Sequence, residues 1–421
     1  VSPASPNATL NLEDHSLTIR GIEKFFISEI LDVFIIPEKN EITLRNNRDL
    51  DFNGQLFAGN FEFIGRDFLF DYDSFLVDLN YIDSIRFYIE DPETGLRRRV
   101  GNKLVSADST ADEALAGLSE DLQQSTGRLY INRPENKSGQ RHYPDYPKFQ
   151  ADKGAIVYFN NPSILDGAYD ESIYFIIPPF EIDSLSDSDP AAIGFNGTFV
   201  AEGILPPFEE TLHIREDNTL GFEHNIAPEG YELYGGSGRI FNKLTINRQG
   251  LTSEGSIKYM STSMESDNFT FYLDSLTADA TEFIVEKGEF DGGSFPDVQV
   301  DSVRLKWLPM KDSMYVWNQD LPFTLYDNTA TLNGLFTVSA TGGFGKGTLL
   351  TRGAEAISDE FSFNETRFGG RHTTFTINSD NPEKAALAGD DIKLDFNLVN
   401  NYADIGPEIE GVAAINFPYA Q

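Results

Sequence analysis

The sequence of 421 residues contains no cysteine. A chain without cysteine forms neither structural disulfides nor thiolate metal sites, and it offers no cysteine nucleophile. Its stability must therefore come from packing and hydrogen bonding. This composition is compatible with a protein of the bacterial envelope or the extracellular space that relies on packing alone.

Basic residues are few beside the acidic ones: Lys and Arg total 32, Asp and Glu total 67, and the formal net charge is −35. This balance argues against nucleic acid as a partner, because phosphates attract a basic surface. It argues equally against anionic membrane surfaces. An acidic surface serves first as a solubility device, and it also suits salt, divalent cations or cationic partners.

Long apolar runs are also missing, and none approaches the roughly 18 residues of a membrane-spanning helix. The chain starts with VSPASPNATL, without an initiator Met and without the charged and apolar stretches of a signal peptide. We interpret it as a processed or excised section of a longer exported protein.

The sequence is rich in hydrophobic residues, which make up 40% and include 34 Phe. They alternate with polar residues, as in GQLFAGNFEFIGRDFLFDYDSFLVDL (residues 54–79), and Asn-Gly pairs at Asn53, Asn196 and Asn333 predict turns between such segments. Period-two alternation predicts strands with one buried face. We therefore predict a mainly β protein with an elongated, repetitive sheet or a β-solenoid-like architecture.

One short inserted helix is predicted near residues 110–124. Thr110 and Glu113 form a capping box, and leucines three and four residues apart then form one apolar stripe. The chain thus divides into N-terminal β units (1–104), the helix with a Tyr/Pro-rich loop and strands (105–190), and tandem β repeats (191–421).

The repeat is visible when the C-terminal region is aligned with itself at an offset of 92 residues, which makes residues 240–283 equivalent to residues 332–375. Glycines and aromatic residues coincide: Gly250, Gly255, Phe269 and Phe271 in the first copy, and Gly342, Gly347, Phe361 and Phe363 in the second. We interpret the two copies as a repeated supersecondary unit.

The stretch GGFGKGTLL (residues 342–350) has the composition of a phosphate-binding loop. Such a loop needs Lys followed directly by Ser or Thr at the start of a helix, whereas Lys346 is followed by Gly347 and by residues typical of strands. The first copy has no lysine there. We expect the glycines to supply positive φ angles in a turn or bulge.

No catalytic residue can be named. The five His lack metal-site spacing, no nucleophile elbow is present, and 67 acidic residues single out no carboxylate pair. Aromatic side chains that could stack on a sugar, with a neighbouring histidine, make the candidate ligand-binding set: Tyr143, Tyr146, His142 and Trp317. Acidic turns give candidate Ca²⁺ ligands, for which solvated loops are the competing interpretation: Asp183, Asp187, Asp189, Asp291 and Asp297. No other cofactor is expected.

The phrases GLTSEGSIKYMSTSMESDNFTF (residues 250–271) and DFNGQLFAGNFEFIGRDFLFDYDSF (residues 51–75) resemble the large, repetitive, β-rich envelope proteins of Bacteroidota-type bacteria. The resemblance implies an exported protein of several β units, and it transfers no catalytic residues.

The leading hypothesis is a non-catalytic structural or interaction protein of the cell envelope or extracellular space, with other surface proteins or a glycan as partners. One alternative is a glycan-binding or carbohydrate-active β-solenoid protein, and another is a β trough that holds lipid. A scaffold buries its Phe rows and has no cleft lined by carboxylates. A glycan protein has a groove with exposed Trp or Tyr and a carboxylate pair, and a trough exposes an unusually large apolar patch along the repeat axis.

Overall fold

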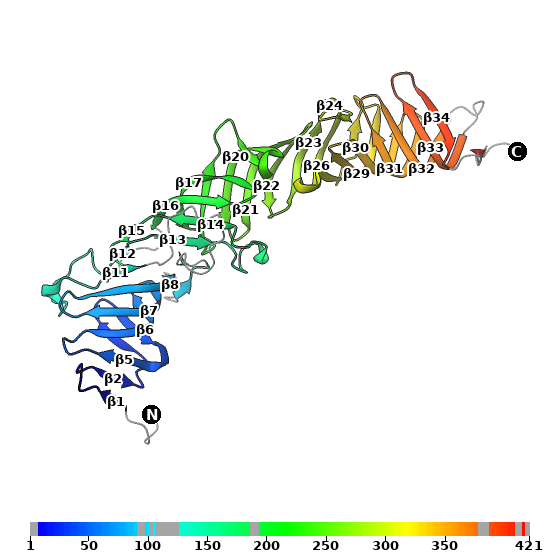
Figure 1. Cartoon of the computed structure of the whole chain (residues 1–421). Coiled ribbons are helices and arrows are strands. Elements are labelled where there is room, and N and C mark those ends of the chain that lie inside the picture. Colours follow the sequence, from blue (N-terminus) through cyan, green and yellow to red (C-terminus); the bar gives the residue numbers. More distant parts are fainter. Residues whose placement is uncertain are drawn as a thin grey trace. The chain divides into compact units, whose positions relative to one another are not determined.

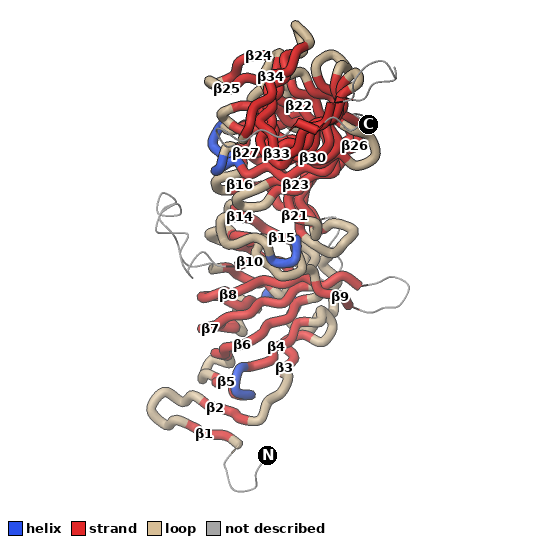
Figure 2. The backbone as a smooth tube through the Cα atoms, turned by 90° about the vertical axis from the view of Figure 1, so that its right-hand side faces the viewer, coloured by secondary structure: helices blue, strands red, loops and turns tan. Residues whose placement is uncertain are grey.

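The computed structural model describes residues 7–90, 97–101, 104–105, 126–185, 193–377, 387–408 and 415–416. These residues form strands and short 3₁₀ turns, and none of them lies in an α-helix (Figure 2). The helix predicted near residues 110–124 lies outside the described residues. Within them, no helix has the length and apolar character needed to cross a membrane.

The chain forms two compact units: residues 1–201 with 207–222, and residues 202–206 with 223–421. We call them unit 1 and unit 2. Both are built almost entirely from strands (Figure 1).

The elements of unit 1, with two strands that continue into unit 2 along the chain, have these bounds: β1 (Ala8–Leu10), β2 (Leu17–Arg20), β3 (Phe25–Ser28), β4 (Val33–Pro37), η1 (Glu38–Asn40), β5 (Glu41–Leu44), β6 (Leu50–Ala58), β7 (Phe61–Asp71), β8 (Leu76–Glu90), β9 (Arg97–Arg99), β10 (Leu104–Val105), β11 (Gly127–Tyr130), η4 (Pro134–Asn136), β12 (Lys148–Ala151), β13 (Ala155–Tyr158), η5 (Leu165–Gly167), β14 (Ile173–Ile177), β15 (Phe180–Ile182), β16 (Gly194–Ala201), β17 (Leu205–Ile214) and β18 (Leu220–Asn225).

The long strands β6, β7 and β8 of unit 1 belong to two layers at once. One end of β6 pairs with β5 and the other with β4, while β8 pairs with β11 at one end and with β10 further along. The register of β6 and β7 shifts between Phe52 and Gly54, so the strands bend there. Between the layers, the rings of Phe63 on β7 and Phe149 on β12 lie 4.7 Å apart.

The remaining elements lie in unit 2: β19 (Tyr231–Leu233), η7 (Tyr234–Gly236), β20 (Gly238–Asn247), β21 (Gly250–Tyr259), β22 (Thr262–Phe271), β23 (Leu276–Val285), β24 (Gly288–Phe290), β25 (Gly293–Phe295), β26 (Val298–Leu308), η8 (Pro309–Lys311), β27 (Ser313–Asn318), β28 (Phe323–Leu325), β29 (Ala330–Ser339), β30 (Gly342–Thr351), β31 (Ala354–Phe363), β32 (Arg367–Ile377), β33 (Leu387–Asn397), β34 (Tyr402–Pro407) and β35 (Ile415–Asn416).

Unit 2 is an antiparallel meander. The strands β20 to β23 pair in order, β23 pairs with β26, and β29 to β33 again pair in order (Figure 1). The short strands β27 and β28 pair with opposite ends of β26 and both pair with β29. The mainly β class is therefore confirmed, whereas a solenoid is not, because these sheets are built from antiparallel hairpins.

The strands on either side of β26 match in position. The bounds of β20, β21 and β22 each become those of β29, β30 and β31 when 92 is added, for example 250 + 92 = 342. A register shift lies between Ser253 and Gly255 in one set and between Gly345 and Gly347 in the other. The Ser266 hydroxyl donates to the Asp279 carbonyl at 2.8 Å, and the Ser358 hydroxyl donates to the Arg371 carbonyl at 2.6 Å.

The core of unit 2 consists of the inward side chains of these strands. Buried and less buried residues alternate along β22 up to Ser266. At the bulge two exposed residues follow instead of one, and the next buried residue is Phe269. The Phe rows are enclosed: Phe269 and Phe271 are 0% exposed, and Phe361 and Phe363 are 1% and 4% exposed.

The Asn-Gly pairs predicted as turns lie instead inside strands. Asn53 is in β6, Asn196 in β16 and Asn333 in β29. The following glycines Gly54 and Gly334 have φ angles of +128° and +147°. Only glycine adopts such angles readily, so these pairs mark bends in the middle of strands rather than their ends.

Candidate functional site

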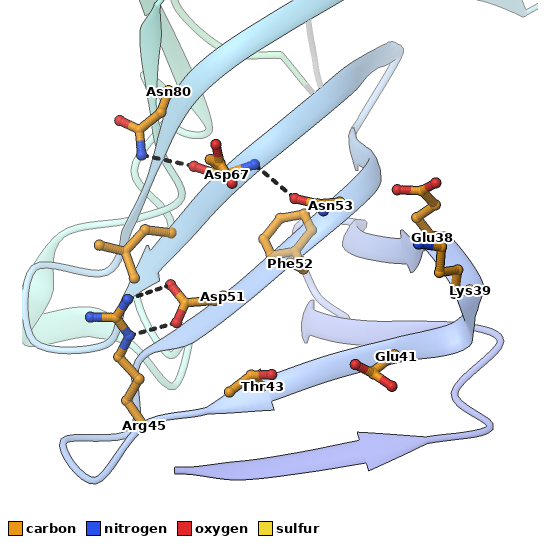
Figure 3. Close-up of a pocket in the computed structure, with 11 residues that line it drawn as sticks. Glu38, Lys39, Glu41, Thr43, Arg45, Asp51, Phe52, Asn53, Asp67 and Asn80 are labelled. Carbon is orange, nitrogen blue, oxygen red and sulfur yellow. Dashed lines mark hydrogen bonds and ion pairs between the residues drawn. The ribbon is translucent and has the colours of Figure 1, made fainter. Parts of the chain in front are cut away.

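A polar groove of about 560 Å³ lies on unit 1, over β5 to β8 and η1 (Figure 3). On these strands the core side takes residues such as Leu50 and Phe68, so the alternate residues face the groove. The lining residues are Glu38, Lys39, Glu41, Thr43, Arg45, Asp51, Phe52, Asn53, Asp67, Leu69 and Asn80.

The centre of the groove is a bulge at Asp67, whose φ angle is +54°. The backbone N–H of Asp67 donates to Asn53 Oδ1 at 2.8 Å, and Asn80 Nδ2 donates to the carbonyl of Asp67 at 2.7 Å (Figure 3). The two amide side chains thus satisfy backbone groups that the bulge removes from the strand ladder. The Asp67 carboxylate takes no part in these two bonds.

Two other carboxylates of the groove are held in ion pairs. The guanidinium of Arg45 donates two hydrogen bonds to the carboxylate of Asp51. Its Nε lies 2.5 Å from Oδ2, and one terminal nitrogen lies 3.0 Å from Oδ1 (Figure 3). The hydrogen bonds to Asp51 raise the pKa of Arg45. Glu41 pairs with Arg20 at 2.9 Å. Part of the negative charge in the groove is therefore neutralised from within.

The groove offers hydrogen-bonding groups and carboxylates. Its lining offers carboxylates, two amides, one hydroxyl and two cations, and no histidine, serine or cysteine is part of it. It therefore lacks the nucleophile and base pair of acyl-transfer enzymes. Nothing in the sequence singles out these residues, because the pair of Asn53 and Gly54 predicts a turn and Asp67 is one of 67 acidic residues.

A second groove of unit 1, of about 580 Å³, is also polar; it is lined by Ile176, Pro178, Asn196, Gly197, Thr198, Glu209, Glu210 and Thr211. The Thr211 hydroxyl donates to Asn196 Oδ1 at 2.7 Å, and the Thr211 N–H donates to Glu210 Oε1 at 2.8 Å. These bonds again use polar side chains to hold the sheet surface.

Three of the predicted ligand-binding residues lie on one ordered loop of unit 1. The buried Asn136 side chain spans this loop, bonding both the N–H and the carbonyl of Arg141 at 3.0 and 2.7 Å. Tyr143 is half-buried beneath the guanidinium of Arg133, 4.2 Å from its ring centre, while Tyr146 is half-buried and His142 is exposed. These contacts hold the loop at the surface of unit 1.

The fourth predicted ligand-binding residue, Trp317, lies on β27 of unit 2 and is 39% exposed. It therefore belongs to a different unit from the loop, and we treat it as part of a separate surface.

The candidate Ca²⁺ ligands are scattered in the structure. Asp187 and Asp189 lie outside the described residues. Asp183 pairs with Lys148 at 3.5 Å, Asp291 is exposed at the β24–β25 turn, and Asp297 accepts a hydrogen bond from the Asp327 N–H at 2.6 Å. Across the described part of the chain, no three His, Asp or Glu side chains are grouped so that they could hold a metal ion.

The chain is an antiparallel β protein of two units, and unit 1 carries two polar grooves, one of which is partly neutralised by its own ion pairs. Comparison with known proteins found no matching family model, no matching curated protein and no matching solved structure.

Proposed function

We propose that this chain is a non-catalytic structural or interaction protein of the cell envelope or the extracellular space, and a section of a longer exported protein. The observation that carries the proposal is the complete burial of the Phe rows, with Phe269 and Phe271 at 0% exposure. Aromatic side chains that fill a closed interior stabilise the fold, and these rows themselves offer no apolar surface to a ligand.

The structural role includes a repeated unit. The equal offset of β20–β22 and β29–β31 supports this part of the proposal, as does the recurrence of the buried serine bonds of Ser266 and Ser358. When one bent, antiparallel unit is repeated, the sheet is extended and each copy is packed by the same pattern of buried residues.

The main groove is lined by four carboxylates, which a scaffold was not expected to show, but the ion pairs of two of them favour a non-catalytic role. A glycosidase holds one carboxyl group protonated in an apolar setting and places a second at a fixed distance. The groove acids Asp51 and Glu41 are instead paired with arginines at the surface. The lipid-holding trough gains no support, because the Phe rows that would line it are enclosed.

Two measurements test the proposal. Native mass spectrometry and organic extraction of the purified full chain are expected to give the polypeptide mass without lipid, whereas stoichiometric lipid would favour the trough. A screen with chromogenic glycosides is expected to show no turnover. Turnover that Asp67→Asn or Glu38→Gln abolishes would establish an enzyme and overturn the non-catalytic role.

The proposed location needs its own test. Fractionation of the producing cells, followed by detection with an antibody, is expected to place the protein in the envelope or the medium. Recovery with the cytoplasmic fraction would contradict it.

A further inference from the structure

On the outer face of β26, β27, β29 and β30 in unit 2, the side chains point away from the core. Strand register aligns them in two rows. One row runs Lys306, Tyr315, Thr337, Phe344, and the other runs Arg304, Trp317, Leu335, Lys346. Figure 2 labels three of these strands, β26, β27 and β30. We call this surface the aromatic face.

Tyr315 and Trp317 are the centre of the aromatic face. They alternate on β27, so both point away from the core, and their rings are nearly parallel, with centroids 6.2 Å apart and an angle of 24° between planes. Trp317 is 39% exposed and Phe344, in the row of Tyr315, is 38% exposed. Burying a large aromatic side chain is favourable in free energy. A ligand that covers these exposed rings would therefore gain binding free energy.

The same strands fold without these aromatic residues elsewhere in the chain. The position 92 residues before Phe344 holds Thr252, and the position before Leu335 holds Lys243. Lys243 forms an ion pair of 2.7 Å with Glu223, the residue 92 positions before Tyr315. The bent antiparallel unit therefore does not require aromatic residues at these positions, and the aromatic face is an addition to it.

Charge on the aromatic face differs in sign from that of the whole chain. Three cations stand in its rows: Arg304, Lys306 and Lys346. Two of them have acidic neighbours, since Arg304 bonds Asp279 at 3.1 Å and Lys346 bonds Asp359 at 2.9 Å. The two rows themselves hold three positive charges and no negative one, and two of the positive charges are paired with acids of the neighbouring strands.

From these observations we propose that the aromatic face binds an extended anionic polysaccharide. The exposed aromatic side chains offer apolar surface to the C–H groups of sugar rings, and the cations of the two rows offer hydrogen bonds to hydroxyl and carboxylate groups. An open sheet surface suits a polymer rather than a small molecule, which prefers a concave site. Nucleic acid is disfavoured, because its binding depends on neutralising many phosphates with Lys and Arg, and the two rows hold only three cations. This activity would add ligand recognition to the proposed structural role and does not depend on it.

The test is affinity electrophoresis of the full chain in native gels that contain sodium alginate, a polyuronate, with dextran gels as the neutral comparison. The wild-type chain is expected to be retarded by alginate and not by dextran. Trp317→Ala and Tyr315→Ala are expected to weaken alginate binding about tenfold each. Lys306→Glu is expected to weaken it as well, and more so at low salt.

The matched control is Leu350→Ala, which removes a 47% exposed apolar side chain from β30 outside the two rows of the aromatic face. It is expected to leave the retardation unchanged. Urea unfolding midpoints of all variants check that the exposed substitutions leave the fold intact. Absence of retardation of the wild-type chain, or retention of it in Trp317→Ala, would overturn the proposal. Equal retardation by dextran would overturn the anionic nature of the ligand.

Discussion

At the scale of single residues, Gly347 shows why glycine stands where the sequence suggested a phosphate loop. Its φ angle is +134°, and its pairing partner Gly334 on β29 has a φ angle of +147°. A Cβ atom on Gly347 would lie 2.2 Å from the carbonyl oxygen of Asn333. The glycine is therefore required by the close approach of two bent strands.

We expect Gly347→Ala to lower the free energy of unfolding by about 1–3 kcal/mol from the backbone conformation, with the clash in addition, and Gly347→Val to lower it further. Urea unfolding followed by circular dichroism measures this. Gly406→Ala is the control, because a Cβ atom there meets nothing within 4 Å. Equal stability of the Gly347 and Gly406 variants would contradict the close approach.

His372 is the residue from which a pH dependence is expected. Its Nδ1 lies 2.8 Å from Asp391 Oδ1, and the hydrogen bond to this carboxylate raises the pKa of His372 from its ordinary value of 6.5. A raised folded pKa means that the folded state holds the proton more tightly than the unfolded chain does. The stabilisation is therefore complete below pH 6.5 and disappears as the pH rises through the folded pKa.

The comparison of wild type with His372→Gln tests this. The wild-type chain is expected to gain stability over the variant at pH 5.5 and to lose that advantage by pH 8.5. An NMR titration of the His372 ring is expected to give a pKa above 6.5. An advantage that grows with pH would show that the imidazole is held in its neutral form.

At the scale of the elements, the bent strand is the feature that organises each unit. In β22 the buried Ser266 hydroxyl bonds across to the Asp279 carbonyl and also accepts the N–H of Asn268 at 3.0 Å. In β31 the Ser358 hydroxyl bonds the Arg371 carbonyl and accepts the N–H of Glu360 at 3.0 Å. The serine hydroxyl satisfies backbone groups that the bulge removes from the strand ladder. The residues beyond the bulge can therefore direct their buried side chains into the same core.

The Phe rows beyond these bulges are expected to dominate stability. Phe269→Ala and Phe361→Ala should each cost about 3–5 kcal/mol, since both side chains are enclosed. Phe344→Ala is the matched control on the outer face, where 38% exposure predicts a loss below about 1 kcal/mol. Denaturant unfolding measures all three, and losses at Phe269 and Phe361 as small as at Phe344 would mean that the rows are not a closed core.

At this scale the sequence predicts the strands and their buried faces, but it does not distinguish a turn between two strands from a bend within one. Alternation identifies which residues of a strand share a face, so the strands and the buried parity of Phe269 and Phe271 were predicted. It cannot tell a turn from a bend, because both need glycine with positive φ. The pairs at Asn53 and Asn333 were therefore assigned to turns, although the strands continue through them.

At the scale of the whole molecule, the net charge of −35 is the dominant property. Repulsion among like charges destabilises a compact state and is screened by salt. We expect the midpoint of thermal unfolding to rise between 10 mM and 500 mM NaCl. A midpoint that does not change with salt would show that the surface charges are already paired.

Divalent cations extend this test to the predicted Ca²⁺ ligands. CaCl₂ and MgCl₂ at equal ionic strength are expected to stabilise equally, because no group of three metal-binding side chains is present in the described part of the chain. A specific rise with CaCl₂ that Asp291→Asn or Asp297→Asn removes would establish a calcium site.

The sequence by itself determined the β class, the exclusion of cysteine chemistry and the offset of 92 residues, because composition and period two are local properties of the chain. Only the tertiary structure decided where those residues meet. It placed Asn53 and Asn80 around Asp67, and it aligned Tyr315 with Phe344 across an intervening strand. Such neighbours depend on strand register and on the positions of bulges, and a bulge changes the register of every residue beyond it.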